Sequence, residues 1–301
     1  MTTPGARAST ADLGGYFPLG PWRVRRAGYG AMQLAGDGFF GPAARDGDEA
    51  VRVLQAAVAA GVDHIDTAQY YGPGTVNQLI REALHPYPAS LAIVSKVAAR
   101  RDTDGALVPF DDPHELRQDI EDNLTTLDID RLAAVNLRIA DPAAPAGRRF
   151  DAQIAALVQA RDEGLIGGVG ISNVSREHLV RARAQTEIVC VQNLFNLADQ
   201  SARDVLAECE AHGIAFVPYC PLGLAGDQRR RLLTEPVLTA TAARLGATPV
   251  QAALAWLLDL ASNILLIPGT RTRGHLAENL AAADVRLDDT ARTELTRHFR
   301  P

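Results

Sequence analysis

The chain has 301 residues, 47% of them hydrophobic, and a formal net charge of −6. This length and apolar content suit a large folded core, and the negative charge argues against nucleic acid or an anionic membrane as partner. The three cysteines, Cys190, Cys209 and Cys220, form neither a paired pattern nor a Cys/His cluster. We therefore expect a protein of the reducing cytoplasm without a metal site.

The first 15 residues are small and polar and lack the apolar run of a signal peptide, so we expect a disordered tail. No later apolar run is long enough to predict a membrane span. The residues around Gly20 and Pro21 predict a short hairpin. No linker or change in composition follows, which predicts one domain over residues 16–301.

Short apolar runs then alternate with helical patterns. Eight runs predict strands: 26–32, 62–68, 91–97, 131–139, 166–173, 187–193, 214–222 and 263–270. Apolar residues at i, i+3 and i+4 predict helices between them, for example over 48–61, 113–127 and 202–213, and four glycines mark helix ends: Gly61, Gly164, Gly213 and Gly246. This series predicts an α/β fold, a (β/α)8 TIM barrel with a short N-terminal hairpin. An open doubly wound sheet is the alternative, but no G-x-G-x-x-G opens the first helix.

Active sites of such barrels lie at the carboxyl ends of the strands. The second strand ends near Asp66 and is followed by Tyr71, the third ends near Lys96, and the fourth carries Asn136. Lys96 is the only lysine in the chain. All the other residues in the combined count of 30 lysines and arginines are arginines. Its place at a strand end indicates a role that needs a compact ammonium rather than a guanidinium.

Three interpretations of these residues stay open on spacing alone. Tyr71 can serve as a general acid whose pKa is lowered by the ammonium of Lys96, with Asp66 holding the lysine in place. Asp66 and Lys96 can instead form a structural ion pair, with Tyr71 in a turn. Lys96 can also act as a Schiff-base nucleophile, as in barrel aldolases.

Seven motifs in a fixed order resemble the aldo-keto reductase family. They are RAGYGAMQLAG, HIDTAQYYG, SKV, GVGISN, VQNLFN, VPYCPLG and IPGTRTRGHLAEN, and they extend from Arg26 to about Leu287. The resemblance implies a (β/α)8 barrel that binds NADPH across its mouth and reduces carbonyl groups. It also implies that Asp66, Tyr71 and Lys96 are the catalytic Asp, Tyr and Lys.

The fourth strand departs from the family pattern. Most members carry a histidine where this chain has Asn136 in the sequence VNLR. An asparagine can donate a hydrogen bond to a carbonyl oxygen but cannot titrate. We therefore expect Asn136 to orient the substrate, Tyr71 to be the sole proton donor, and the pH profile to lack an imidazole limb.

The resemblance also implies a set of cofactor-binding residues around the barrel mouth. Ser172, Asn173 and Gln192 would hold the carboxamide, Tyr219 would stack on the nicotinamide, and Arg271 and Arg273 favour NADPH over NADH because guanidinium pairs with phosphate. Asn173 and Ser175 also compete as the cap of the next helix. The remaining expected members are Gly30, Met32, Cys220, Leu222, Gly223, Gly269, Thr270, His275, Glu278 and Asn279.

Finer details resemble the bacterial pyridoxal reductases within this family, which implies pyridoxal as the favoured small-molecule substrate. The expected substrate-binding residues are Phe39, Phe40, Tyr70, Arg100 and Arg138, with Arg101 beside them. Arg100 and Arg101 can alternatively pair with Asp102 and Asp104, and the long loop 98–112 is a candidate lid. Two other functions stay open: a reductase of ketones or aldehydes in secondary metabolism, and a cofactor-binding sensor with vestigial turnover.

Overall fold

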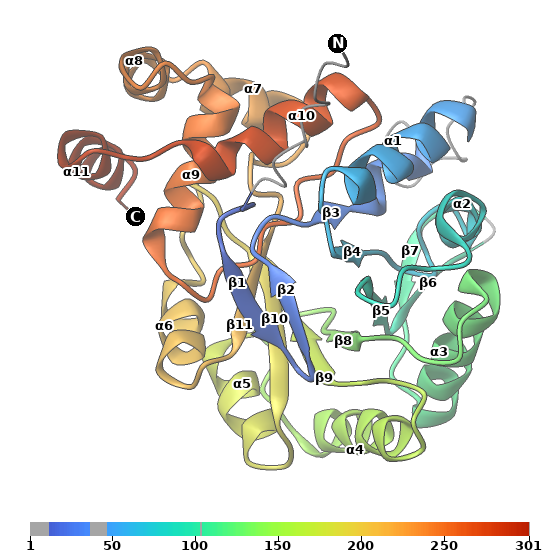
Figure 1. The fold of residues 1–301 in the computed structure, drawn as a ribbon. Helices are drawn as coiled ribbons and strands as arrows, with labels where there is room; N and C mark the ends of the chain where they lie inside the picture. The colour runs from blue at the N-terminus through green and yellow to red at the C-terminus, as the bar shows by residue number, and fades with distance from the viewer. Residues whose placement is uncertain (1–11, 37–46, 103, 301) are drawn as a thin grey trace, which may run out of the picture.

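The computed structural model describes residues 12–36, 47–102 and 104–300, and its centre is a curled parallel sheet (Figure 1). Seven strands lie in the order β11-β10-β9-β8-β5-β4-β3, and every neighbouring pair is parallel. In chain order they are β3 (Tyr29–Gly30), β4 (His64–Asp66), β5 (Ala92–Val97), β8 (Ala134–Arg138), β9 (Val169–Ser172), β10 (Ile188–Leu194) and β11 (Ala215–Tyr219).

The eighth run, residues 263–270, closes the barrel without forming a regular strand. Single parallel bridges join Ile264 to Phe216 on one side and Leu266 to Ala27 on the other. The (β/α)8 barrel is thus confirmed, while the prediction of a full eighth strand is wrong. Beyond Leu266 the chain enters Ile267, Pro268 and Gly269, and Pro268 has no N–H to continue a ladder.

Helices surround the sheet, as Figure 1 shows. The α-helices are α1 (Gly47–Ala59), α2 (Thr75–Leu84), α3 (Pro113–Leu127), α4 (Arg148–Asp162), α5 (Arg176–Arg183), α6 (Arg203–Ala211), α7 (Asp227–Leu233), α8 (Pro236–Arg244), α9 (Pro249–Leu260), α10 (Arg273–Ala281) and α11 (Asp289–His298), and the 3₁₀ helices are η1 (Ala31–Ala35) and η2 (Ala282–Asp284). The predicted helices at 48–61, 113–127 and 202–213 are confirmed within two residues. Among the described residues, no helix has the length and apolar character needed to cross a membrane.

The predicted N-terminal hairpin is present and plugs one end of the barrel. It consists of β1 (Tyr16–Leu19) and β2 (Trp22–Arg25), paired antiparallel. Leu19 and Val24 are buried in one apolar cluster with barrel residues Ala92, Val94, Ala133, Ala134, Val189, Cys190, Ala215, Val217, Leu265 and Ile267. Because several of these residues begin their strands, the hairpin seals the amino end of the barrel and leaves the carboxyl end open for a site.

The predicted disordered tail is wrong for residues 12–15, and residues 1–11 lie outside the described part of the chain. Leu13 is buried, and its carbonyl accepts a hydrogen bond from the Ala27 N–H. The carbonyl of Gly15 accepts another from Arg26. An apolar side chain and two backbone hydrogen bonds therefore extend the ordered domain to residue 12.

The long loop expected at 98–112 contains a second small hairpin. It is formed by β6 (Ala99–Arg101) and β7 (Leu107–Pro109), which pair antiparallel. The Arg101 guanidinium donates to the carbonyl of Gly105 at 2.7 Å and so braces the turn.

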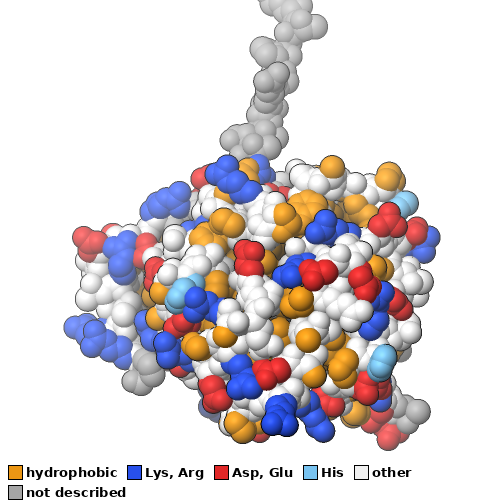
Figure 2. Space-filling model, turned by 90° about the horizontal axis from the view of Figure 1, so that it is seen from below, with side chains coloured by type: hydrophobic (Ala, Val, Ile, Leu, Met, Phe, Trp, Pro, Cys, Tyr) orange, Lys and Arg blue, Asp and Glu red, His pale blue; other side chains and the backbone are white. Residues whose placement is uncertain are grey.

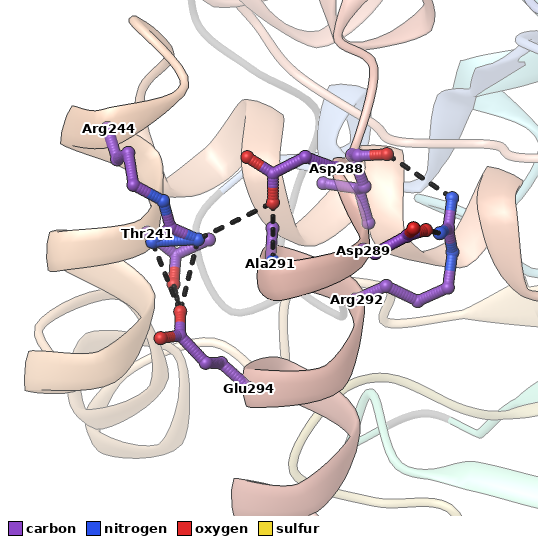
Figure 3. A network of polar contacts seen from close by, with 8 residues as sticks. Thr241, Arg244, Asp288, Asp289, Ala291, Arg292 and Glu294 are labelled. Carbon is purple, nitrogen blue, oxygen red and sulfur yellow. Dashed lines mark hydrogen bonds and ion pairs between the residues drawn. The ribbon is translucent and has the colours of Figure 1, made fainter.

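Ion pairs fasten the C-terminal helix to its neighbours (Figure 3). The guanidinium of Arg244 on α8 lies 3.1 Å from the carboxylate of Glu294 on α11. Arg292 on α11 contacts Asp289 on its own helix and Asp259 on α9, each at 2.6 Å. On the face seen in Figure 2, basic and acidic side chains are interspersed in the same way, which fits a surface of paired charges.

Candidate active site

A cavity of about 340 Å³ lies at the carboxyl ends of the barrel strands. Every described strand of the barrel contributes to its wall, as does the closing segment 267–269. Most of the residues expected at the site meet there: Gly30, Met32, Asp66, Tyr70, Tyr71, Lys96, Arg138, Ser172, Gln192, Tyr219, Cys220, Leu222, Gly223 and Gly269. The structure thus brings these residues, from all seven described barrel strands, together around one cavity.

The ammonium of Lys96 has three partners. Its Nζ lies 2.5 Å from Asp66 Oδ1, and it donates to the Thr67 carbonyl and to the Tyr71 hydroxyl oxygen, both at 3.0 Å. Lys96, Asp66 and Tyr71 are each at most 5% exposed. These three hydrogen bonds use all the donors of an ammonium, so the side chain of Lys96 is held in a single position.

Gln192 supports this network from β10. Its Nε2 donates to the second carboxylate oxygen of Asp66 at 2.9 Å. That bond fixes the orientation of the amide, because only its NH₂ end can donate to a carboxylate. The other end of the amide, Oε1, is buried and has no hydrogen-bond partner among the described residues. A buried acceptor of this kind calls for a donor that a bound molecule could bring.

Burial controls the protonation of the phenols. Burial raises the pKa of Tyr71 well above its usual value, the charge of Asp66 adds to this effect, and the charge of Arg138 opposes it. The expectation that the Lys96 ammonium makes Tyr71 unusually acidic is therefore wrong as a net effect: desolvation of the phenolate wins. Tyr71 keeps its proton at neutral pH, as a proton donor must. Tyr70 packs edge-on against it, with ring centroids 5.2 Å apart.

Asn136 is not among the residues that line the cavity. It is fully buried, and its Oδ1 accepts from the Cys190 thiol at 3.2 Å. A Cβ at Gly170 would lie only 2.2 Å from that oxygen, so the amide fills the space that the glycine leaves. The Nδ2 of Asn136 is buried and has no hydrogen-bond partner among the described residues, so a donor stays available there, and the residue that β8 contributes to the cavity wall is Arg138.

Asn173 lies just behind the cavity wall. Its backbone is left-handed, with φ of 59°, and its side chain donates to the Ile139 carbonyl at 2.8 Å. It also accepts a hydrogen bond from the Tyr219 hydroxyl at 3.2 Å. The cap of α5 is Ser175, which accepts from the His178 N–H. Asn173 is therefore bonded to the wall residue Tyr219 and does not cap the helix.

The other expected cofactor residues follow Gly269 along the chain, outside the cavity wall. Thr270 is buried, and Arg271, Arg273 and His275 are exposed around the first turn of α10. Arg273 forms a long ion pair with Glu49, at 3.5 Å. Farther along α10, Glu278 is half-buried and Asn279 is buried. These residues follow the wall residue Gly269 along the chain and are called the α10 polar group below.

The expected substrate residues divide into three groups. Tyr70 and Arg138 line the cavity. Arg100 does not, because it is exposed, pairs with Glu115 and lies 5.3 Å above the Phe110 ring. Phe39 and Phe40 lie outside the described residues.

Sequence reasoning missed part of the wall. The missed residues are Gln33, Leu107, Pro221, Leu224, Ala225, Arg229, Ile267 and Pro268. Leu107 comes from the β6–β7 hairpin, within the segment 98–112 that is the predicted candidate lid. Arg229 comes from α7 and is the first arginine of the run DQRRR, whose positive charge was the signal in the sequence that could have indicated it.

A comparison with known proteins decides the family. The pattern that defines the aldo/keto reductase family matches residues 26–299. The chain belongs to the aldo/keto reductase family. This aldo/keto reductase is 47% identical over 276 residues to the pyridoxine 4-dehydrogenase of Escherichia coli strain K12, which covers 91% of this chain and 94% of that protein. It is also 34% identical to an uncharacterized oxidoreductase of Schizosaccharomyces pombe, over 95% of this chain and 90% of that one. The chain is an oxidoreductase.

Solved structures agree on the fold of this aldo/keto reductase. A thermostable aldo-keto reductase in complex with the inhibitor epalrestat superposes with a TM-score of 0.78 at 31% identity, over 94% of this chain and 98% of that one. An aldo-keto reductase from Klebsiella pneumoniae in complex with NADPH gives a TM-score of 0.79 at 24% identity, over 95% of each chain. At that lower identity the second likeness bears on the fold alone.

Proposed function

We propose that this aldo/keto reductase uses NADPH to reduce small aldehydes to alcohols, with pyridoxal the favoured substrate. The observation that carries the proposal is the buried contact of Tyr71 with Lys96 in the cavity wall. The 47% identity to a pyridoxine 4-dehydrogenase supports the choice of substrate. Fold alone would not, because substrates drift within a fold.

The cavity has features that fit a nicotinamide. The unpartnered Oε1 of Gln192 is a buried acceptor that a carboxamide NH₂ could satisfy, and Ser172 lies in the same wall. Tyr219 offers a ring beside them, held by its hydrogen bond to Asn173. When bound, NADPH supplies the hydride.

The α10 polar group fits the end of the cofactor that lies away from the nicotinamide. We propose that Arg271 and Arg273 contact the phosphate that distinguishes NADPH from NADH, because a guanidinium matches a phosphate bidentately. The contact between Arg273 and Glu49 is long and partly exposed, so it is easily exchanged for a phosphate. His275, Glu278 and Asn279 lie on the same helix and extend this proposed site. Arg229 on α7 also lines the cavity and would add a cation for the phosphates between the two ends of the cofactor.

The proton step follows from the network. Tyr71, kept protonated by burial, donates its proton to the carbonyl oxygen as negative charge develops there. The phenolate that remains is 3.0 Å from the Lys96 ammonium, which stabilises it. Asp66 holds the ammonium and is itself held by Gln192. In this proposal the proton donor and its compensating charge are in position before the reaction begins.

The same geometry argues against the two other interpretations of Lys96. A Schiff-base lysine must give up its proton, whereas this Nζ donates to three oxygens, one of them a carboxylate. A purely structural ion pair does not account for the hydroxyl of Tyr71 as third partner in the wall of a cavity.

The decisive experiment follows NADPH consumption with a panel of aldehydes and ketones that includes pyridoxal. Wild-type protein should consume NADPH with pyridoxal, and Tyr71→Phe should lose about 10²- to 10⁴-fold in kcat. NADPH fluorescence titrations should show similar cofactor binding in both proteins. Tight NADPH binding without consumption of any carbonyl compound would instead favour the sensor function. A ketone reduced faster than every aldehyde would favour a role in secondary metabolism. A cytoplasmic location and a single domain stay predictions from the sequence.

A further inference from the structure

Arg138 occupies a distinctive place in the cavity. It is the last residue of β8 and stands in register with Ser172 on β9. It is partly buried and contributes to the cavity wall. Tyr71 lies in the wall on the β4 side, and Tyr219 lies in the wall on the β11 side. A substrate that meets both the proton donor and the nicotinamide therefore comes within reach of Arg138.

Among the described residues, the guanidinium of Arg138 has no counter-charge bonded to it. Within residues 12–36, 47–102 and 104–300, no carboxylate forms an ion pair with it and no acceptor forms a hydrogen bond with it. Two arginines on the surface, Arg244 and Arg292, by contrast have carboxylate partners (Figure 3). The carboxylate of the site, Asp66, is bonded to Lys96 and Gln192.

The electrostatics of the neighbouring phenols agree with this position. The positive charge of Arg138 opposes the rise in pKa that burial causes at Tyr70, Tyr71 and Tyr219. One guanidinium thus acts on three hydroxyl groups from different sides of the cavity. An anion placed among these groups would find a cation and several O–H donors.

The chemistry of the proposed substrate supplies such an anion. At neutral pH the ring nitrogen of pyridoxal holds a proton and the 3-hydroxyl group beside the aldehyde is ionised. We propose, resting on the proposed function, that Arg138 is a specificity residue that binds the oxyanion ortho to the reacting aldehyde. The substrate class is then aromatic aldehydes with an ionised ortho hydroxyl group.

Two physical reasons favour this match. The planar guanidinium presents N–H groups in a fork that suits two neighbouring oxygens, here the oxyanion and the carbonyl oxygen. During reduction, negative charge also grows on the carbonyl oxygen next to an existing anion. A cation that contacts both oxygens offsets that repulsion in the transition state, where it accelerates the reaction.

Two isomeric probes separate the position of the anion from its presence. Both 2-hydroxy-5-nitrobenzaldehyde and 4-hydroxy-3-nitrobenzaldehyde carry an ionised phenol near neutral pH, but only the first has it beside the aldehyde. The third probe, 3-nitrobenzaldehyde, has no hydroxyl group. Chromatography of the alcohol products gives kcat/KM for each probe with NADPH.

Arg138→Gln should lower kcat/KM for the ortho isomer by about 10- to 100-fold. The loss for the other two probes should be at least about tenfold smaller. Arg138→Lys should recover part of the ortho preference, because it keeps the charge without the fork. Arg149→Gln removes an equal charge from an arginine that is 79% exposed and paired with Asp111, and serves as the matched control. An equal loss with all three probes would overturn the proposal.

A binding measurement keeps this test independent of turnover. Calorimetry on the protein loaded with NADP gives the dissociation constant of the ortho isomer when no hydride is available. If Arg138→Gln binds the ortho isomer about tenfold or more weakly than wild type does, the inference is supported. If in addition no aldehyde is reduced, only the proposed function fails. Equal dissociation constants refute the role of Arg138, whatever the enzyme reduces.

Discussion

Replacing Lys96 with methionine removes a buried cation and leaves its partner behind. Asp66 is 4% exposed, so its carboxylate would keep the hydrogen bond from Gln192 but lose the ammonium 2.5 Å away. Leaving one charge of a buried pair uncompensated typically costs about 3–5 kcal/mol of stability. We expect a decrease of this size in the free energy of unfolding of Lys96→Met.

The double variant Asp66→Asn/Lys96→Met isolates the cause. It removes the buried charge together with the cation, so it should recover at least about half of the lost stability. Catalysis should not recover, because neither variant has an ammonium to stabilise the Tyr71 phenolate. Both should turn over about 10²- to 10⁴-fold more slowly than wild type.

Urea unfolding followed by circular dichroism gives the stabilities, and NADPH consumption with pyridoxal gives the rates. The reasoning would be refuted by a single variant that unfolds within about 1 kcal/mol of wild type and retains near-wild-type turnover. A double variant no more stable than the single one would show that the loss comes from packing and not from an unpaired charge.

Three further predictions concern other parts of the molecule. Gly30→Ala should lower both the melting temperature and the NADPH affinity, because the new Cβ would lie 2.4 Å from the Ile267 carbonyl oxygen. Gly274→Ala is the control: its new Cβ meets open space, so the melting temperature should not fall. Burial raises the pKa of Asp119 from 3.8 to about 8, so between these values the folded state keeps a proton that the unfolded state has lost. Wild-type stability should then fall as pH rises through this window, by up to roughly 1.4 kcal/mol per pH unit, and Asp119→Asn should gain on wild type from pH 5 to pH 8; a constant difference in urea midpoint would contradict this. No histidine lines the cavity in the described part of the chain, so kcat should show no step near pH ~6.5, and such a step in a pH-rate profile would require another proton donor.

The sequence by itself determined the barrel and the meeting of Asp66, Tyr71 and Lys96 in it. Parallel strands end at a common edge, so Asp66, Lys96 and the following Tyr71 had to come together once the alternation of strands and helices was recognised. The expected glycines at helix ends, such as Gly61 and Gly164, have positive φ values of 100° and 89°. Local patterns were sufficient for these features because each depends on the chain's own period and direction.

Depth within the barrel was decided only by the tertiary structure. Asn136 and Arg138 share one face of β8, but Arg138 lies two positions farther along the strand, a rise of about 6.6 Å. Asn136 stands in register with Lys96, whose long side chain reaches the cavity while the short amide stays level with Cys190. Sequence spacing shows to which face of a strand a side chain points. It does not show how deep that side chain lies below the carboxyl edge of the neighbouring strands.

The protonation of Tyr71 was likewise decided by the assembled structure. From sequence, the nearby ammonium predicted a lowered pKa, because only the pair could be seen. Folding adds the desolvation of the phenol by the walls of the barrel and the charge of Asp66, and their sum raises the pKa. Desolvation depends on atoms contributed by every strand, so no local stretch of sequence contains it.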